Sequence, residues 1–314
     1  MIRRDRVHLR IGSRYFPYLM AASIIASVGI ALIASFHFMK ALAGGRTTVI
    51  AAGSGGEAVV LSWDRQRGKL TIIEIPGDVR MDGVYGKGQL PLGSFLHLED
   101  LDRGGKQGLF VKTVGDALGL PIAGFLRISS GAPIGKEDAI NAFSPFHPSG
   151  WRSGSLPRGV RFRLWWEWRS IRPDAVWPMR LEDLGVFRQE VLPDGSLTRV
   201  FDTERFDSAA AGRLEVAAVR REAKRVLIVN TTGLAGLGSR AGRVLSQAGI
   251  AVAAVESETA LQTSCSIHAR KELWDGPSVR FIRFVFACTL SEEGNDSRVD
   301  ITVRLGLREA DDYR

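Results

Sequence analysis

The glycine-rich segment around residue 236 is the part of the sequence whose spacing could hold a cofactor. Gly236, Gly238 and Ala241 follow the pattern G-x-G-x-x-A, and Glu256 ends the next predicted strand, where a ribose ligand would stand. That fingerprint needs a tight turn, but residues 231–235 separate the preceding strand from the first matching glycine. The chain after Glu256 is also too short for a doubly wound sheet. We therefore expect a close-packed structural turn and no cofactor.

The chain has two cysteines, Cys265 and Cys288. In a protein exported from the cytosol an even pair predicts a structural disulfide, which would close a loop of about 22 residues and contribute roughly 3 kcal/mol. The alternative is two unrelated buried thiols. Walker A, zinc-finger and zincin patterns are absent from the sequence, and its histidines lack partners at ligand spacing. We therefore predict no metal site.

Tryptophan and arginine lie close together between residues 158 and 172. The candidate binding residues of this segment are Trp165, Trp166, Trp168, Arg163 and Arg169. Such a cluster can stack on single-stranded nucleic acid, or contact anionic lipid or polymer. In the third interpretation the tryptophans pack on the domain body and the arginines extend over them. We favour this packing, with lipid or envelope polymer as the next choice.

The basic excess of the chain is concentrated at its N-terminus. The net charge is +8 at pH 7, and half of it comes from five arginines and one aspartate before residue 15. Residues 15–39 contain no Asp, Glu, Lys or Arg, and about 20 apolar residues are enough to cross a bilayer core. A cleaved signal peptide ending near Ala41-Leu42-Ala43 is the alternative, but its apolar region would be shorter.

This charge pattern predicts the localisation. The positive-inside rule leaves the N-terminus in the cytoplasm and the bulk of the chain extracytoplasmic, in a single-pass plasma-membrane protein with a transmembrane signal-anchor helix. Nucleic acid is then not an expected partner. A hydrophobic content of 45% with 24% charged residues favours a folded chain over a disordered one.

The first exported region shows strand and helix patterns in alternation. Residues 58–63 and 69–75 predict a β-hairpin, and Pro76-Gly77-Asp78 ends its second strand. Residues 82–108 contain seven glycines and one proline, which predicts a loop-rich excursion. The other elements expected here are strands at 49–52 and 121–128 and a helix at 110–118 that ends at Gly119.

The second exported region has a βαβ pattern. A linker helix over 201–223 leads to a strand at 225–230, a helix with Ser239 as its N-cap that ends at Gly249, and a strand at 250–256. A final strand is expected at 299–305. The apolar run at 279–290 fits either a strand or a helix.

The second region resembles the LytR C-terminal domain over residues 224–308. That domain has a strand ending in Asn, a glycine-rich turn and a closing Asp-Ile-x-x-x-Leu-Gly strand. The residues that carry the resemblance are Asn230, Gly233, Gly236, Gly238, Asp300 and Gly306. By this resemblance residues 279–290 are a helix.

The anchor and the first exported region resemble the LytR-CpsA-Psr (LCP) cell-envelope family. Residues 69–78, Lys-Leu-Thr-Ile-Ile-Glu-Ile-Pro-Gly-Asp, are similar to the family's strand ending in Ser-Ile-Pro-Arg-Asp. The resemblance implies transfer of glycopolymer from a polyprenyl-pyrophosphate carrier to the cell wall. Arginines would bind the pyrophosphate, acidic residues a magnesium ion, and a hydrophobic groove the lipid.

The chain departs from the family at the residues that carry this chemistry. Gly77 stands where the family has its motif arginine, so the bidentate phosphate clamp is missing there. The family's later Arg/Asp-rich motif has no match between residues 130 and 200. Weak substitutes are Asp78, Arg80 and Glu57. We expect a degenerate member that kept the fold and lost the transferase site.

The expected fold is α/β (α+β): one transmembrane helix, a reduced LCP-like domain and a small LytR C-terminal domain. The expected divisions are 1–14 cytoplasmic, 15–39 transmembrane, 45–200 LCP-like, 201–223 linker helix, 224–308 LytR C-terminal and 309–314 tail. We expect a non-catalytic scaffold that contacts wall glycopolymer, polyprenyl-linked glycan or envelope proteins. The alternatives are an active Mg-dependent phosphotransferase and a membrane-tethered transcription attenuator.

Overall fold

The computed structural model shows a mixed α/β chain. It describes Tyr18, Met20 and residues 45–101, 108–128, 136–144, 155–156, 158–259, 261–292 and 298–311. Among these residues, no helix combines the length and the apolar character needed to cross a bilayer. The predicted membrane segment 15–39 lies outside the described residues except for Tyr18 and Met20, and so does the predicted cytoplasmic tail 1–14.

A five-stranded sheet is the centre of the region predicted as the first domain, residues 45–200. Its order is β6 (Gly124–Arg127), β1 (Arg46–Ala52), β2 (Ala58–Asp64), β3 (Lys69–Ile75) and β7 (Val176–Arg180). β1, β2 and β3 are antiparallel, while β6 runs parallel to β1 and β7 parallel to β3. The predicted hairpin is therefore confirmed, and β3 ends before Pro76 as expected.

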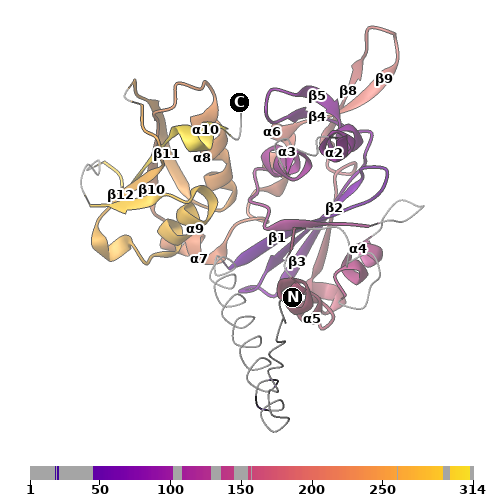
Figure 1. Ribbon diagram of the computed structural model, residues 1–314, viewed down its shortest axis with the longest axis horizontal. Helices are drawn as coiled ribbons and strands as arrows, with labels where there is room; N and C mark the ends of the chain where they lie inside the picture. The colour runs from indigo at the N-terminus through magenta and orange to yellow at the C-terminus, as the bar shows by residue number, and fades with distance from the viewer. Residues whose placement is uncertain are drawn as a thin grey trace, which may run out of the picture. The chain divides into compact units, whose positions relative to one another are not determined.

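Both faces of this sheet are covered, since every residue of β2 is buried. Ile50, Val60 and Ile73 face a core shared with α2 (Leu92–Leu101), α3 (Leu109–Leu118) and α6 (Thr203–Ala210). Because side chains alternate along a strand, their neighbours face the opposite layer. There α4 (Lys136–Ala142) and α5 (Arg158–Trp168) lie (Figure 1). The sheet is thus the middle layer of three.

The predicted loop-rich excursion over 82–108 is wrong for its described part. β4 (Arg80–Gly83) and β5 (Gly88–Pro91) form a hairpin that leads directly into α2. Gly86 and Gly88 have φ values of 63° and 68°, so the glycines make the tight turn of an ordered hairpin. β4 also pairs with β9 (Leu197–Phe201), which pairs with β8 (Phe187–Val191) in a second sheet.

The helix predicted at 110–118 is confirmed as α3, and Gly119 follows it in the left-handed conformation with φ 63°. The strand predicted at 121–128 is present as the shorter β6. A 3₁₀ turn, η3 (Pro173–Ala175), leads into β7.

Residues 201–223 form two short helices in place of the single linker helix expected. Phe206 and Ala210 of α6 belong to the first core, together with Leu214. Val219 of α7 (Ala217–Glu222) belongs to a second core that begins with Val216. Between the two helices Gly212 has φ 75°, a conformation that interrupts a helix.

The second core surrounds a five-stranded sheet. Its order is β11 (Ala251–Ser257), β10 (Arg225–Asn230), β14 (Ile301–Leu305), β12 (Ser266–Ala269) and β13 (Thr289–Ser291). β10 and β11 are parallel and joined through α8 (Leu237–Gln247), so the predicted βαβ unit is confirmed. β14 confirms the predicted final strand.

The helices of this second unit differ from the prediction in one detail. α8 begins at Leu237 with Gly236 as its N-cap at φ 80°, so the prediction of Ser239 as N-cap is wrong. α9 (Pro277–Phe286) confirms the helix implied by resemblance, and η4 (Lys271–Leu273) precedes it. α10 (Leu307–Asp311) extends into the predicted tail.

Candidate functional site

Gly77 follows β3 at one end of the central sheet, where backbone segments pack against each other. A Cβ at Gly77 would lie 2.4 Å from the carbonyl oxygen of Gly55 and 3.0 Å from the amide nitrogen of Glu57. The amide of Gly93 donates a 2.8 Å hydrogen bond to the Gly77 carbonyl oxygen. A Cβ at Gly56 would meet the Gly93 Cα at 2.0 Å. We name Gly55, Gly56, Gly77 and Gly93 the glycine cluster.

The candidate catalytic residues at this end hold separate structural partners. The exposed carboxylate of Asp78 accepts hydrogen bonds of 2.6 and 2.7 Å from the Arg199 guanidinium, which lies 3.7 Å from Glu182. Arg80 donates a 2.6 Å hydrogen bond to the Gln89 carbonyl oxygen across the β4–β5 hairpin. These contacts hold Arg80 within its own hairpin and neutralise Asp78.

Glu57 lies against the turn between β1 and β2. A Cβ at Gly53 would be 2.0 Å from the Glu57 Oε1, so the carboxylate occupies the space above this turn. Within the described residues, no group of three or more His, Cys, Asp or Glu side chains is arranged to hold a metal ion. The donors at this end therefore do not fit the magnesium ion that the family resemblance implies.

The predicted tryptophan and arginine cluster divides into a buried and an exposed part. Trp168 is buried, with its ring edge-on to Phe143 at 5.0 Å. Trp166 is 52% exposed, and the Arg169 guanidinium lies 4.0 Å from its ring centroid. Trp165 is half-buried beside it, at a centroid distance of 6.3 Å. Trp168 thus packs on the domain body, while Trp166 is exposed with Arg169 over its ring.

Glu167 fixes α5 to the central sheet. It accepts hydrogen bonds from Trp63 Nε1 at 2.9 Å, Arg65 Nε at 3.0 Å and Arg163 Nε at 2.8 Å. Burial raises the pKa of Glu167, but the hydrogen bonds from Arg163 and Arg65 outweigh it, so its pKa lies below the ordinary value. Arg163, a candidate binding residue, therefore serves this internal carboxylate.

A charged cavity of about 250 Å³ lies where the two cores meet. Arg243 of α8 binds the Asp207 carboxylate at 2.5 and 2.7 Å and donates to the backbone carbonyls of Asp116 and Ala117. Arg240 lies 3.5 Å from Asp116. Burial raises the Asp116 pKa, and the two arginines oppose the shift. Charges of both signs are balanced here, which makes this cavity a structural junction.

Asn230 organises the glycine-rich turn after β10. Its Oδ1 accepts hydrogen bonds from the Thr232 amide at 3.1 Å and hydroxyl at 2.7 Å, and its Nδ2 donates to the Leu234 carbonyl oxygen at 2.8 Å. Gly233 and Gly236 follow at φ 70° and 80°. The polar atoms of Asn230 are thus used inside the turn.

The other motif residues of the second unit also make internal contacts. A Cβ at Gly238 would lie 2.6 Å from Val255, and one at Gly306 2.5 Å from the Ser264 backbone, so both positions require close packing. Asp300 accepts a 2.9 Å hydrogen bond from the Arg225 amide. Glu256, considered above as a ribose ligand, pairs with Arg298 at 3.4 Å.

The predicted disulfide between Cys265 and Cys288 is confirmed, with the two Cα atoms 4.5 Å apart and both residues buried. It joins the segment before β12 to the short segment between α9 and β13, which stabilises the second core.

Sequence reasoning did not find Arg199, Gly93 or Trp177. Arg199 lies 121 positions from Asp78 in the chain, and Gly93 meets Gly77 only because the β4–β5 hairpin folds back. Trp177 stands outside the tryptophan-rich segment, on β7. An isolated residue gives no local sequence signal, because strand pairing determines which residues it contacts.

No family model matches this chain, and no curated protein sequence matches it. Solved structures are similar to about half of it. For the crystal structure of B. subtilis TagV the identity is 10%, covering 52% of this chain and 93% of that one, at a TM-score of 0.40. TagT bound to LIIa-WTA has an identity of 13%, covering 52% of this chain and 88% of that one, at a TM-score of 0.38.

A third similar structure is the LytR-CPS2A-psr family protein YwtF (TagT) with bound octaprenyl pyrophosphate lipid. Its identity is 14%, covering 52% of this chain and 88% of that one, at a TM-score of 0.37.

Proposed function

We propose that this chain is a membrane-anchored, extracytoplasmic envelope protein of LCP-like build that binds an envelope partner or wall glycopolymer without catalysing transfer. The support is the sequence resemblance over residues 59–78 and 224–308, together with the charge pattern of residues 1–39. The β3 strand, which ends at Ile75 before Pro76, and the βαβ unit of the second core agree with this build.

The glycine cluster is the observation that carries the non-catalytic part of the proposal. An arginine at residue 77 would supply the fork of donors that binds a phosphate through two hydrogen bonds. A Cβ there would already lie 2.4 Å from the Gly55 carbonyl oxygen. Backbone thus fills the space that a side chain at this position would need, and an arginine cannot enter without moving the turn.

Relocated ligands are the alternative, and the contacts at this end of the sheet argue against them. Asp78 is paired with Arg199, and Arg80 is bonded to Gln89. Binding a lipid pyrophosphate with Arg80 would require breaking the hydrogen bond that supports the β4–β5 hairpin.

Partner binding has support in the second unit, where β11 is an edge strand. Its residues are exposed except for the half-buried Val252, and Val255 is 43% exposed. An edge strand offers backbone donors and acceptors that a strand of another protein can pair with. We therefore favour a protein partner at β11 over direct binding of polymer by the turn residues.

The test is an assay of binding and turnover on the full chain in lipid nanodiscs. The chain is mixed with a polyprenyl-pyrophosphate glycan and Mg²⁺, and release of glycan from the lipid is measured. We expect no release from the folded protein.

Mg²⁺-dependent release that Arg80→Ala abolishes would contradict the proposal and support the phosphotransferase. Arg188→Ala is the matched control, because Arg188 is also a strand arginine and forms a surface ion pair with Glu190 at 2.6 Å. Thermal unfolding of each variant confirms that the loss of activity is not a loss of fold.

A further inference from the structure

A basic pocket lies at the opposite end of the central sheet, where β1, β3 and β7 begin. Its volume is about 260 Å³. The side chains that give it charge and an aromatic wall are Arg46, Arg67, Lys69, Arg213 and Trp177. They come from β1, the β2–β3 turn, β3, the segment after α6 and β7, so strand pairing gathers them.

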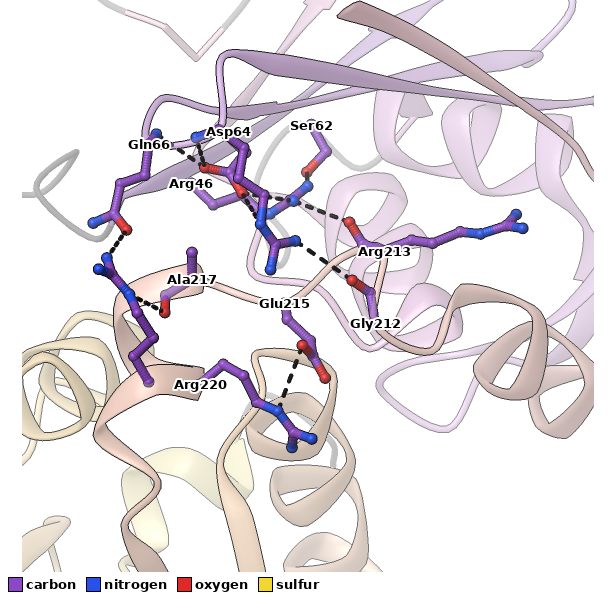
Figure 2. Close-up of polar contacts among 11 residues, drawn as sticks. Arg46, Ser62, Asp64, Gln66, Gly212, Arg213, Glu215, Ala217 and Arg220 are labelled. Atoms are coloured by element: carbon purple, nitrogen blue, oxygen red, sulfur yellow. Dashed lines mark hydrogen bonds and ion pairs between the residues drawn. The ribbon is translucent and has the colours of Figure 1, made fainter.

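Two of the four cations share the buried carboxylate of Asp64. Arg46 Nη2 lies 3.2 Å from Asp64 Oδ2, and Arg67 Nε lies 3.8 Å from it. Arg46 also donates to Ser62 Oγ and to the Arg213 carbonyl oxygen, both at 3.0 Å (Figure 2). Burial lowers the Arg46 pKa, and Asp64 opposes the shift. Arg46 and Asp64 thus form the floor that holds the pocket together.

Lys69 and Arg213 have a different role, because within the described part of the chain neither makes an ion pair with a carboxylate. Lys69 Nζ lies 5.7 Å and the Arg213 guanidinium carbon 4.7 Å from the Trp177 ring centroid. The pocket therefore has more positive than negative charge, in contrast to the balanced cavity at Arg243. Such a site favours an anion.

Exposed aromatic side chains lie at the same end of the sheet. Glu167 bonds α5 to Trp63 and Arg65, which are at the end of β2, and so places this helix there. Phe162 and Trp166 on α5 are 47% and 52% exposed, and Trp177 is 40% exposed. Tryptophan with arginine is the composition of surfaces that lie at a membrane interface.

The chain length before β1 brings this end of the sheet close to the predicted membrane segment. That segment ends at residue 39, and β1 begins at Arg46. The six residues between them span about 20 Å at most when fully extended. This tether keeps the beginning of β1, where the basic pocket lies, within that distance of the end of the predicted segment.

We propose that this end of the sheet rests on the outer membrane surface, with the basic pocket binding the phosphate of an anionic phospholipid headgroup. Lys69 and Arg213 contact the phosphate, and Trp177, Trp166 and Phe162 enter the interface. The proposal rests on the membrane anchor of the proposed function. The glycine cluster, at the far end of the same strands, then points away from the bilayer.

The experiment uses the full chain in nanodiscs and measures quenching of tryptophan fluorescence by phospholipids brominated near the headgroup. The chain has seven tryptophans, and none lies within residues 15–39, so quenching reports on the exported part. We expect quenching in discs of anionic lipid. The double variant Trp166→Phe/Trp177→Phe should lose most of it.

Trp274→Phe is the matched control, because Trp274 lies in the second unit and donates a 3.1 Å hydrogen bond to the Ala269 carbonyl oxygen. This variant should keep the quenching of the native chain. Lys69→Gln/Arg213→Gln should weaken quenching in anionic discs and leave that in neutral discs unchanged, which would support the headgroup site.

Equal quenching of the charge variant and the native chain in anionic discs would overturn the headgroup pocket. A chain that enters the discs but shows no quenching would overturn the surface contact while leaving the anchor intact. A chain that does not enter the discs would contradict the proposed function itself. Binding of glycerol phosphate in detergent without quenching in discs would assign the pocket to a soluble phosphate and overturn the lipid.

Discussion

The two ends of the central sheet differ in packing and in charge, although the same strands form both. At the end formed by Gly77 and the β1–β2 turn, the glycine cluster has no room for a Cβ and backbone meets backbone. At the other end Arg46 and Asp64 are buried as a pair, and Lys69 and Arg213 add cations around Trp177. One end is closed by packing, and the other is open and charged. Binding chemistry is therefore better supported at the end where the chain leaves the predicted anchor.

This difference shows why a family resemblance does not transfer a site. The resemblance over residues 69–78 identifies the strand and its end, which are set by hydrophobic packing. The chemistry depends on the side chain at residue 77, where glycine replaces the family's arginine. With glycine at residue 77, the β1–β2 turn and Gly93 pack against the backbone there and occupy the space that a side chain would need.

The largest effect should follow from adding a side chain to the glycine cluster. Gly77→Ala places a Cβ 2.4 Å from the Gly55 carbonyl oxygen, and we expect it to lower the free energy of unfolding by about 4 kcal/mol. Urea unfolding measures this. Gly242→Ala is the control, because a Cβ there has its nearest contact at 3.4 Å, and alanine should be neutral or stabilise α8 by up to about 1 kcal/mol. Equal stability of Gly77→Ala and the native chain would show that the glycine end has room.

At the basic end, the largest effect should come from breaking the buried pair. Asp64→Asn leaves the Arg46 guanidinium buried without its carboxylate and should cost about 3 kcal/mol. Asp174→Asn is the control, since Asp174 and its partner Arg172 are 70% and 82% exposed, and removing that pair should change stability by less than about 0.5 kcal/mol. Similar small effects for both variants would contradict the role of Arg46 and Asp64 as the floor of the pocket.

A smaller, pH-dependent effect is expected where α5 joins the sheet. Glu167→Gln weakens the bonds to Arg65 and Arg163, which are partly exposed, and should cost about 1 kcal/mol at pH 7. Because the pKa of Glu167 is lowered in the folded chain, its contribution is present above the ordinary value of 4.5 and is lost as the pH falls through the lower folded value. Unfolding of both proteins from pH 7 to pH 3 measures the difference. A difference in the free energy of unfolding that persists at pH 3 would rule out the Glu167 carboxylate as its source.

The smallest effect should be at the exposed pair beside the glycine cluster. Asp78 and Arg199 are 65% and 37% exposed, so Arg199→Ala should change stability by about 0.5 kcal/mol or less. Thermal unfolding checks this, with Arg188→Ala as the control at another exposed pair, Arg188 with Glu190. A loss of several kcal/mol in the free energy of unfolding would mean that the Asp78–Arg199 ion pair stabilises this end of the sheet as well as the packing of the glycine cluster.

The sequence predicted the parts of the fold that repeat locally. Strand alternation indicates β2 and β3, helical spacing indicates α3 and α8, and the pair of cysteines predicts the disulfide. The β4–β5 hairpin has no clear sequence signal because its three glycines and one proline resemble those of a loop, while the pairing of β4 with β9 crosses more than a hundred residues.

The functional surfaces could be predicted only in part. Trp166 and Arg169 lie in a segment rich in tryptophan and arginine, which predicts a candidate binding surface. Lys69, Trp177 and Arg213 each stand alone in the sequence. They meet because β3 pairs with β7 and the segment after α6 passes over the same strands. Long-range pairing of this kind has no local pattern.

Photocrosslinking at the two ends of the sheet tests the central comparison most directly. A benzophenone amino acid replaces either Trp177, at the basic pocket, or Asp78, beside the glycine cluster, in the full chain in membranes. We expect lipid adducts from position 177 and none from position 78. Adducts from position 78 with none from position 177 would reverse the orientation and contradict it.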